Sequence, residues 1–344
     1  MKYISHKKLE NFCTSALAAK HVREDVRYHV TTSLIQTSLR GVDSHGVRLL
    51  PHYLRAIDAG RINPKPNYKF TETSITTWRL DADHTFGHAA GGEGMQKAIS
   101  MAEKNGMCSI AIFNSTHFGA AAYFSLLAAN KGMIGLSFTH ADSLMLSYNG
   151  TRPFFGTNPI CFTAPCDGED PFCLDMATTQ VNWNKIIEYR DNKKTMPHDW
   201  GVDINGLETI DPEKVAFLLS IGKYKGFGLA MMIEILCSIL TGMPHGRNIT
   251  QMYSDSLEKK RLLGHFFMAI NIDCFENIGV FKKRLKKLMD EVRHEPSFNP
   301  NIPVKVPGDP EKEMYRIRVK KGIPIDDVTM QAFHEIANEI NFDL

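Results

Sequence analysis

The stretch Asn114-Ser115-Thr116-His117-Phe118-Gly119 joins two segments whose residue patterns predict different secondary structures. The apolar run before it, at 107–113, favours a buried strand. The Ala- and Leu-rich run after it, at 120–131, predicts a helix that Gly132 ends. His117 then lies on a turn between a strand and a helix, a common position for functional side chains in α/β sheets. On this pattern His117 is either chemically active or hydrogen-bonded within its own turn.

Length and composition are those of an ordinary globular protein. The 344 residues are 43% hydrophobic and 23% charged, which suffices for a large core and favours two domains over one. The 40 basic and 38 acidic residues give a formal net charge of +2, so no strong field indicates nucleic acid or an acidic membrane. No signal peptide is visible, and the most apolar run, 227–240, is too short to span a bilayer. We expect a cytoplasmic location.

Cysteine and histidine spacings indicate neither disulfides nor a metal site. The 7 cysteines form no Cys-x-x-Cys pair, which favours buried, reduced thiols. His84 and His88 have the spacing of two zinc ligands on a helix, but Thr85 replaces the glutamate that a metalloprotease needs. There is no G-x-S-x-G motif either, so we expect no metal and no serine nucleophile.

Helical patterns dominate both ends of the chain, whereas its middle alternates strands with helices. Apolar residues at helical spacing predict helices at 5–17, 23–39, 53–59, 281–289 and 326–340. Alternating or continuous apolar runs predict strands at 71–80, 133–139, 160–163 and 171–174, the first of them at the edge of a sheet.

The segment 86–94 contains four glycines and opens a further helix. Such a segment can bind a phosphate at a helix N-terminus. Its spacing is not G-x-G-x-x-G, however, and no acidic residue at the required distance completes a dinucleotide-binding fingerprint. We therefore favour a structural explanation, in which the glycines let the helix pack closely against the sheet.

Polar residues follow several of the predicted strands. His140-Ala141-Asp142, Asn158 and Asp175 each come at or near a strand end, so we expect them to converge on one crevice. Lys225 begins an apolar helix, where a cation opposes the helix dipole. A ligand carboxylate or phosphate would remove that conflict, although a lysine that extends into water would as well.

These residues suit the oxidation of a hydroxy acid. As a hydride leaves the carbon, a base with a pKa near the working pH must take the hydroxyl proton, and the imidazole of His117 can do so. A carboxylate such as Asp175 can fix the tautomer of a histidine, and His45 can tune or relay the proton. Arg48 can bind a substrate carboxylate through two parallel hydrogen bonds.

Five motifs, in this order, resemble the malate/L-lactate dehydrogenase family. They are Asp43-Ser44-His45-Gly46-Val47-Arg48, Asn114-Ser115-Thr116-His117-Phe118-Gly119, Phe155-Gly156-Thr157-Asn158-Pro159, Asp175-Met176-Ala177-Thr178 and Tyr224-Lys225-Gly226-Phe227-Gly228. This family is distinct from the Rossmann-type dehydrogenases and includes ureidoglycolate dehydrogenase, sulfolactate dehydrogenase and diketogulonate reductase. The resemblance covers about 5–275. Within the family, the chain is most similar to ureidoglycolate dehydrogenases through Met196-Pro197, Trp200, Asp203, Asn205-Gly206, Asp211-Pro212 and Gly246-Arg247.

The resemblance implies an α/β fold with a non-Rossmann NAD(P)-binding domain. That domain, expected at 71–269, has a mixed, largely antiparallel sheet flanked by helices. A mainly helical second domain, expected at 1–70 with 270–344, handles the substrate and dimerisation. The resemblance also implies a homodimer, a small carboxylate substrate, and NAD or NADP as cofactor, with NAD favoured.

The resemblance also assigns expected roles to single residues. The catalytic residues are His117 as proton acceptor and donor, with His45 and Asp175. The substrate-binding residues are Ser44, Arg48, Tyr53 and Asn158. The cofactor-binding residues are His140, Ala141, Asp142, Asp175, Met176, Ala177, Lys225, Gly226 and, on the adenosine side, Arg284. Ala141 stands where some relatives carry a cofactor-contacting serine, so only its backbone can serve.

Three alternatives stay open at the level of sequence. The same scaffold could reduce cyclic imino acids or keto sugars, because fold alone does not set the substrate. The protein could bind its cofactor without catalysis. The basic run 282–287 could belong to a nucleic-acid module, although such a run is usually a solvated helix face and we expect neither a nucleic acid nor a membrane as partner.

Overall fold

The centre of the computed structural model, which describes residues 2–191 and 193–344, is a seven-stranded sheet. Its order is β2 (Lys69–Ser74), β3 (Thr77–Asp81), β4 (Met107–Ser115), β12 (Leu263–Asn271), β5 (Met133–Thr139), β8 (Ile160–Ala164) and β9 (Phe172–Met176). The β3–β4 pair is parallel and the other five neighbouring pairs are antiparallel. The expected mixed, largely antiparallel sheet is confirmed. The single edge strand predicted at 71–80 is instead the hairpin of β2 and β3, of which β2 lies at the edge.

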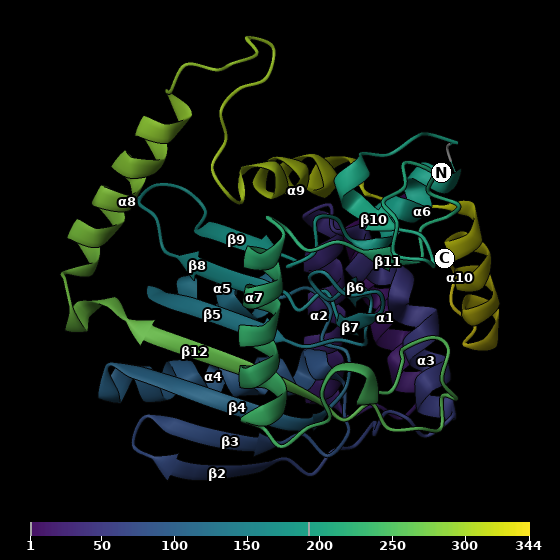
Figure 1. The fold of residues 1–344 in the computed structure, drawn as a ribbon. Coiled ribbons are helices and arrows are strands. Elements are labelled where there is room, and N and C mark those ends of the chain that lie inside the picture. Colours follow the sequence, from purple (N-terminus) through teal and green to yellow (C-terminus); the bar gives the residue numbers. More distant parts are fainter. Residues whose placement is uncertain (1, 192) are drawn as a thin grey trace.

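Helices cover both faces of this sheet (Figure 1). On one face lie α4 (Gly87–Asn105) and α5 (Ala122–Ala129), and on the other stands α7 (Tyr224–Glu234), which continues into the π-helical turn Ile235–Ile239. Alternate residues of β4 are buried, so Cys108, Ile110 and Ile112 join the core beneath α4 and α5. The period-two pattern of the strand therefore places one row of side chains against these helices.

The glycines of α4 bring its backbone close to neighbouring side chains. A Cβ atom on Gly91 would lie 2.6 Å from the ring of Phe124, and one on Gly94 would lie 2.6 Å from Cδ1 of Ile112. One on Gly87 would lie 2.3 Å from the Thr116 carbonyl oxygen, in the turn that carries His117. Close packing, as favoured above, thus explains these glycines.

A second layer is helical and combines both ends of the chain. It contains α1 (His6–Ala19), α2 (Glu24–Leu39), α3 (Leu50–Asp58), α9 (Asp309–Lys321) and α10 (Asp327–Glu339). Ser5 caps α1 by accepting from the Lys8 amide, as its position predicts. Phe12 and Phe333 pack with ring centroids 5.1 Å apart, and β1 (Lys2–Ile4) pairs antiparallel with β13 (Ile323–Ile325).

A small four-stranded sheet lies beside these layers. Its order is β10 (Gly201–Val202), β11 (Phe217–Leu218), β6 (Met145–Leu146) and β7 (Pro153–Phe155), and α6 (Trp183–Asp191) packs nearby. The predicted turn at 148–150 joins β6 to β7. The described cysteines are all free, and only Cys274 is exposed. None of the helices in the described ranges is long and apolar enough to cross a membrane.

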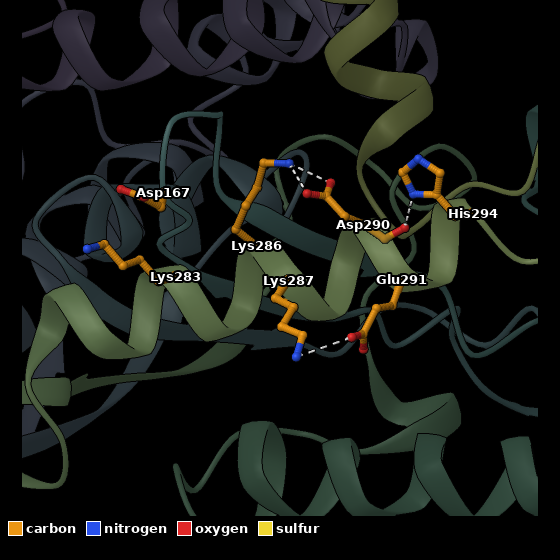
Figure 2. A pocket seen from close by; sticks show the side chains of 7 residues that line it. All are labelled: Asp167, Lys283, Lys286, Lys287, Asp290, Glu291 and His294. Atoms are coloured by element: carbon orange, nitrogen blue, oxygen red, sulfur yellow. Dashed lines mark hydrogen bonds and ion pairs between the residues drawn. The ribbon is translucent and has the colours of Figure 1, made fainter.

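The basic helix α8 (Ile278–Arg293) lies beyond the strand ends of the large sheet, on the side where β12 ends (Figure 1). It lines a groove of about 540 Å³ whose walls carry Asp167, Lys283, Lys286, Lys287, Asp290, Glu291 and His294 (Figure 2). Lys286 and Lys287 pair with Asp290 and Glu291, one turn further along the helix. The run 282–287 is therefore partly neutralised by its own helix.

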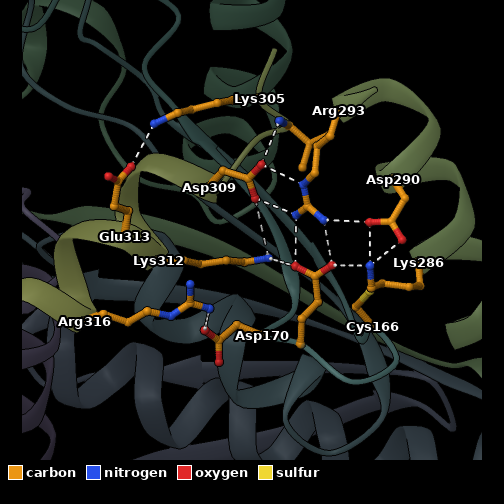
Figure 3. Close-up of polar contacts among 12 residues, drawn as sticks. Cys166, Asp170, Lys286, Asp290, Arg293, Lys305, Asp309, Lys312, Glu313 and Arg316 are labelled. Atoms are coloured by element: carbon orange, nitrogen blue, oxygen red, sulfur yellow. Dashed lines mark hydrogen bonds and ion pairs between the residues drawn. The ribbon is translucent and has the colours of Figure 1, made fainter. Parts of the chain in front are cut away.

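An ion-pair cluster around Glu169, the Glu169 cluster, ties α8 to α9 and to the β8–β9 turn. Arg293 donates to both carboxylate oxygens of Glu169, at 2.8 and 2.9 Å, and to Asp309 at 2.7 Å. Lys312 donates to Glu169 at 3.2 Å (Figure 3). Hydrogen bonding from Arg293 overcomes the effect of partial burial and lowers the pKa of Glu169 to about 2.

Candidate active site

Four rings from four separate segments meet near one end of the large sheet, and we call them the histidine corner. His117 follows β4, His45 ends a 3-10 turn before α3, Tyr53 lies in α3, and His88 lies in the first turn of α4. The rings of His45 and His117 stack, with centroids 5.5 Å apart and an interplanar angle of 25°. The structure therefore brings together the two histidines on which the predicted chemistry depends.

Local hydrogen bonds fix the turn that presents His117. The Thr116 hydroxyl donates to the Thr85 carbonyl at 3.0 Å and accepts from the Gly87 amide at 3.2 Å. Gly119 has a φ of 77°, which favours glycine. A Cβ atom there would also lie 2.6 Å from Nε2 of His88, so the turn passes directly over this buried ring.

One ring nitrogen of His117 has a hydrogen-bond partner in the described protein, and the other has none. The Tyr53 hydroxyl lies 2.8 Å from Nδ1 of His117. Nε2 has no hydrogen-bond partner within the part of the chain that the structure describes. Burial, followed by the nearby charges of His45, His88 and Arg261, puts the pKa of His117 well below 6.5, so its imidazole is neutral at pH 7.

The second stacked ring has its own polar environment. The Ser44 hydroxyl lies 2.7 Å from Nδ1 of His45. Burial and the Arg48 guanidinium lower the pKa of His45 to about 4, so it too is neutral at pH 7. Arg48 is exposed and lies within electrostatic range of His45. Ser44 and Arg48 thus lie around His45, and His45 and Tyr53 contact His117.

Two buried arginines line one cavity with Tyr53 and His117 of the histidine corner. Arg61, 1% exposed, donates to four carbonyl oxygens of the 252–259 segment at 2.7 to 3.2 Å. Arg261, 2% exposed, donates through Nη2 to Asp142 at 2.7 Å. The second oxygen of Asp142 accepts from the Met252 amide at 3.0 Å. Asp142, a predicted cofactor residue, is thus engaged in holding Arg261 and its loop.

A small cavity of about 10 Å³ separates these arginines from the histidine corner. It is lined by His52, Tyr53, Ala56, Arg61, Ile62, Thr116, His117, Met252 and Arg261. This volume is close to the smallest that holds one water molecule.

Asp175 lies in β9, at the N-terminus of α5. Its carboxylate accepts from the Ala122 amide at 2.9 Å. The residue as a whole is exposed, but desolvation of its carboxylate outweighs this bond and raises the pKa of Asp175 to about 6. In the described chain, no hydrogen bond or ion pair joins Asp175 to His117 or His45. The structure therefore does not bring Asp175 into contact with the two histidines.

Asn158 and His140 lie inside a closed polar network. The fully buried Asn158 donates to Glu234 at 2.8 Å and to the Ala230 carbonyl, and it accepts from the Ala141 amide at 3.2 Å. His140 lies 3.5 Å from Glu234 and accepts from Gly264. The amide group of Asn158 is used within the protein, and neither side chain lines the cavity beside His117.

The remaining predicted cofactor residues form a more exposed strip. The Ile221 amide donates to the Thr178 carbonyl at 3.0 Å, which places the start of α7 beside the segment after Asp175. Met176 and Ala177 are partly exposed. Lys225 is exposed and has no ion pair among the described residues, so it fits a phosphate group of a dinucleotide. A Cβ atom on Gly226 would lie 2.2 Å from the Ile221 carbonyl, so this glycine is needed for packing.

Arg284 is remote from the histidine corner. It lies on α8, where it pairs with Glu276 at 2.7 Å. The helix α8 follows the end of β12 that pairs with Met107, whereas His117 follows the opposite end of β4. A nine-residue strand separates the two, roughly 26 Å.

Two residues of the region were not identified from sequence. His88 is fully buried and neither of its ring nitrogens has a hydrogen-bond partner in the described residues. Arg261 stands in the run Lys259-Lys260-Arg261, which reads as a solvated basic surface. No group of three or more His, Cys, Asp or Glu side chains within the described ranges could hold a metal ion.

Comparisons with known proteins agree on one family. A family model described as malate/L-lactate dehydrogenase matches residues 4–334. A ureidoglycolate dehydrogenase (NAD(+)) of Escherichia coli is 34% identical over 326 residues, which cover 94% of this chain and 91% of that protein. An L-sulfolactate dehydrogenase of Methanocaldococcus jannaschii is 34% identical, with 90% and 89% covered. The crystal structure of malate dehydrogenase from Entamoeba histolytica superposes with a TM-score of 0.94 at 31% identity, covering 100% and 99% of the two chains.

Proposed function

The chain belongs to the malate/L-lactate dehydrogenase family, and we propose that it interconverts a small 2-hydroxy acid and its 2-oxo acid with His117 as general acid and base. In class it is an NAD(P)-dependent dehydrogenase that acts on a CH–OH group. The observation that carries the proposal is the state of His117: Nδ1 is held by Tyr53 while Nε2 faces no protein partner in the described chain.

The proton chemistry follows from this arrangement. In the oxidative direction the hydroxyl proton of the substrate passes to Nε2 of the neutral His117, and in the reductive direction it returns to the new hydroxyl oxygen. Tyr53 stays protonated, because burial raises its pKa well above 10, so its hydroxyl can hold Nδ1 in either direction. The nicotinamide, when bound, accepts or donates the hydride.

The groups around the stacked rings of His45 and His117 bind the substrate in this proposal. Arg48 is the exposed cation of the set and can bind a carboxylate. Ser44 holds Nδ1 of His45 at 2.7 Å and so fixes the ring that stacks on His117. For the cofactor we propose Lys225 at a phosphate and the strip 175–177 alongside it, with Asp175 shaping the strip through its bond to Ala122.

The proposed substrates are malate, lactate, ureidoglycolate and sulfolactate. The relatives named above act, by their names, on acids of this type, which favours a hydroxy acid over a cyclic imino acid or a keto sugar. A panel of these substrates, run with NAD and with NADP in both directions, tests the choice. We expect NAD to be preferred, and activity with imines alone would contradict the proposal.

The test of His117 is its replacement by alanine. We expect kcat for the best hydroxy acid to fall by about a hundredfold or more, because the general base is lost. Binding of NADH, followed by its fluorescence, should remain. The matched control is His294→Ala, which changes an exposed histidine just after α8 and should keep its activity. Unchanged turnover in His117→Ala, with cofactor bound, would remove His117 from the role.

A homodimer is the second part of the proposal, and α7 supports it. Its outer face, with the π-helical turn, exposes Tyr224, Met231, Met232, Ile235, Ile239 and Leu240 by 40 to 60%. Monomers rarely expose a contiguous apolar patch of this kind, and a second copy of the same face would cover it. Light scattering should give a dimer mass for the native chain and a monomer mass for Ile235→Glu/Ile239→Glu. Leu288→Glu, on α8 and 57% exposed, should remain dimeric.

A further inference from the structure

Arg261 is a buried cation with unused donors beside the proposed general base. Arg261 is 2% exposed. Among its side-chain nitrogens in the described structure, only Nη2 has a hydrogen-bond partner, which is the Asp142 carboxylate at 2.7 Å. Nε and Nη1 are buried and have no hydrogen-bond partner among the described residues. Leaving the donors of a buried charged group unpaired is costly, so such a group marks a position where a ligand supplies the missing acceptors.

The surroundings of Arg261 favour an anion. The cavity that it lines also touches Tyr53 and His117, and the described lining contains two guanidinium groups and no carboxylate. Arg61 already donates hydrogen bonds to four carbonyl oxygens. Its positive charge therefore adds to the electrostatic attraction for an anion, but Arg61 does not itself bind the anion. The one carboxylate nearby, Asp142, is bound to Arg261 from outside the cavity lining.

The size and position of the cavity suit one end of a small acid. About 10 Å³ accommodates a single water molecule or one oxygen atom of an acidic group. His117 forms one wall, and this residue is partly exposed. An acidic group can therefore insert an oxygen toward Arg261 while the rest of the molecule lies against the histidine corner.

We propose that Arg261 binds an acidic group of the substrate. The cavity that Arg261 lines together with Tyr53 and His117 places its guanidinium group beside the proposed general base. Asp142 is the positioning residue that holds Arg261 in place, and its second oxygen anchors the loop through Met252. The assignment rests on the proposed hydroxy-acid chemistry for its substrate, but its anion can be tested alone.

The first test measures anion binding without cofactor or turnover. Malonate, which has no hydroxyl to oxidise, should raise the melting temperature of the native protein, because a ligand that binds only the folded state stabilises it. The rise should be lost in Arg261→Gln and retained in Arg293→Gln, the matched control. Arg293→Gln also removes an arginine that is paired with a carboxylate, but one that lies in the Glu169 cluster and not at this cavity.

The second test is kinetic and decides the proposal. Arg261→Gln should raise KM by about 10- to 100-fold, the loss expected for a hydrogen bond to a charged group. Arg261→Lys, which keeps the charge opposite Asp142, should give a smaller rise. If KM rises for malate alone, Arg261 binds the second acidic group of malate, which lactate lacks. If KM rises for both malate and lactate, Arg261 binds the carboxylate next to the reacting carbon.

Unchanged KM for malate and lactate in both Arg261 variants would overturn the proposal while leaving the dehydrogenase function intact. The reverse failure is distinguishable as well. If the native protein oxidises no 2-hydroxy acid, yet malonate stabilises it and not Arg261→Gln, the hydroxy-acid function fails and the anion site at Arg261 stands.

Discussion

Charged side chains gather in two parts of this molecule, and only one of them leaves donors unused. In the Glu169 cluster, Arg293 donates to Glu169 and Asp309, and the nearly buried Lys312 donates to Glu169 as well. Behind the histidine corner, Arg261 is equally buried but two of its nitrogens have no partner in the described chain. The paired charges of the Glu169 cluster hold secondary-structure elements together. The unpaired donors of Arg261 lie beside a reactive side chain, where they can bind a ligand.

The largest expected effect is the loss of folding stability when the Glu169 cluster is broken. Glu169→Ala should lower the free energy of unfolding by about 3 kcal/mol, because it strips Arg293 and the buried Lys312 of a shared partner. Denaturant unfolding measures this change, and the KM for the best substrate should stay the same. Glu313→Ala, which breaks the exposed pair with Lys305, is the control and should cost less than about 0.5 kcal/mol. Equal losses in the two variants would show that the cluster contributes no more than an ordinary surface pair.

The next effect should appear in catalysis and not in stability. Tyr53→Phe removes the hydroxyl that holds Nδ1 of His117 at 2.8 Å and keeps the packed ring. We expect kcat to fall by about 10- to 100-fold, equivalent to about 2 kcal/mol, since the imidazole loses its fixed orientation. The melting temperature should change little. A kcat equal to that of the native enzyme would mean that His117 is oriented by other contacts.

The effect that is smallest at neutral pH, because it appears only on acidification, concerns the pH at which each region begins to lose stability. Burial lowers the pKa of His88 and of His265 to about 3 in the folded state, against about 6.5 when unfolded. The unfolded chain therefore binds protons first as the pH falls, and stability drops by about 1.4 kcal/mol per pH unit for each histidine between 6.5 and 3. Glu169, with a folded pKa of about 2, responds only below 4.5.

Unfolding of the native protein and of Glu169→Ala at several pH values checks this order. The decline between pH 6.5 and 5 should be the same in both proteins, because it comes from the histidines. A native protein whose stability stays flat down to pH 4.5 would contradict the assignment.

Much of the fold could be predicted because its signals are local. The strand before His117 and the helix after it follow from runs of neighbouring residues, and the glycines of 86–94 indicate close packing from their number alone. The meeting of His45 with His117 came from the family motifs, since no local pattern joins residues so far apart. The catalytic and cofactor roles, and the domain boundaries, remain predictions.

Other features depend on distant partners and could not be predicted. Arg261 is buried because Asp142, 119 residues earlier, pairs with it, whereas its own neighbours read as a basic surface. Asn158 looked available for a substrate, but Glu234 and Ala230 take its amide donors inside the core. In both cases the contact that decides the role is made by tertiary structure alone.

The pairing of β1 with β13 has a consequence for biosynthesis. On the ribosome, the strands from β2 to β12 are made before residues 323–325, so the large sheet can form while the end of the helical layer is still in the exit tunnel. Residues 2–4 must wait for β13, and Phe12 of α1 must wait for Phe333 of α10. During translation the first strand of the chain therefore stays without its partner until almost the whole chain has been made.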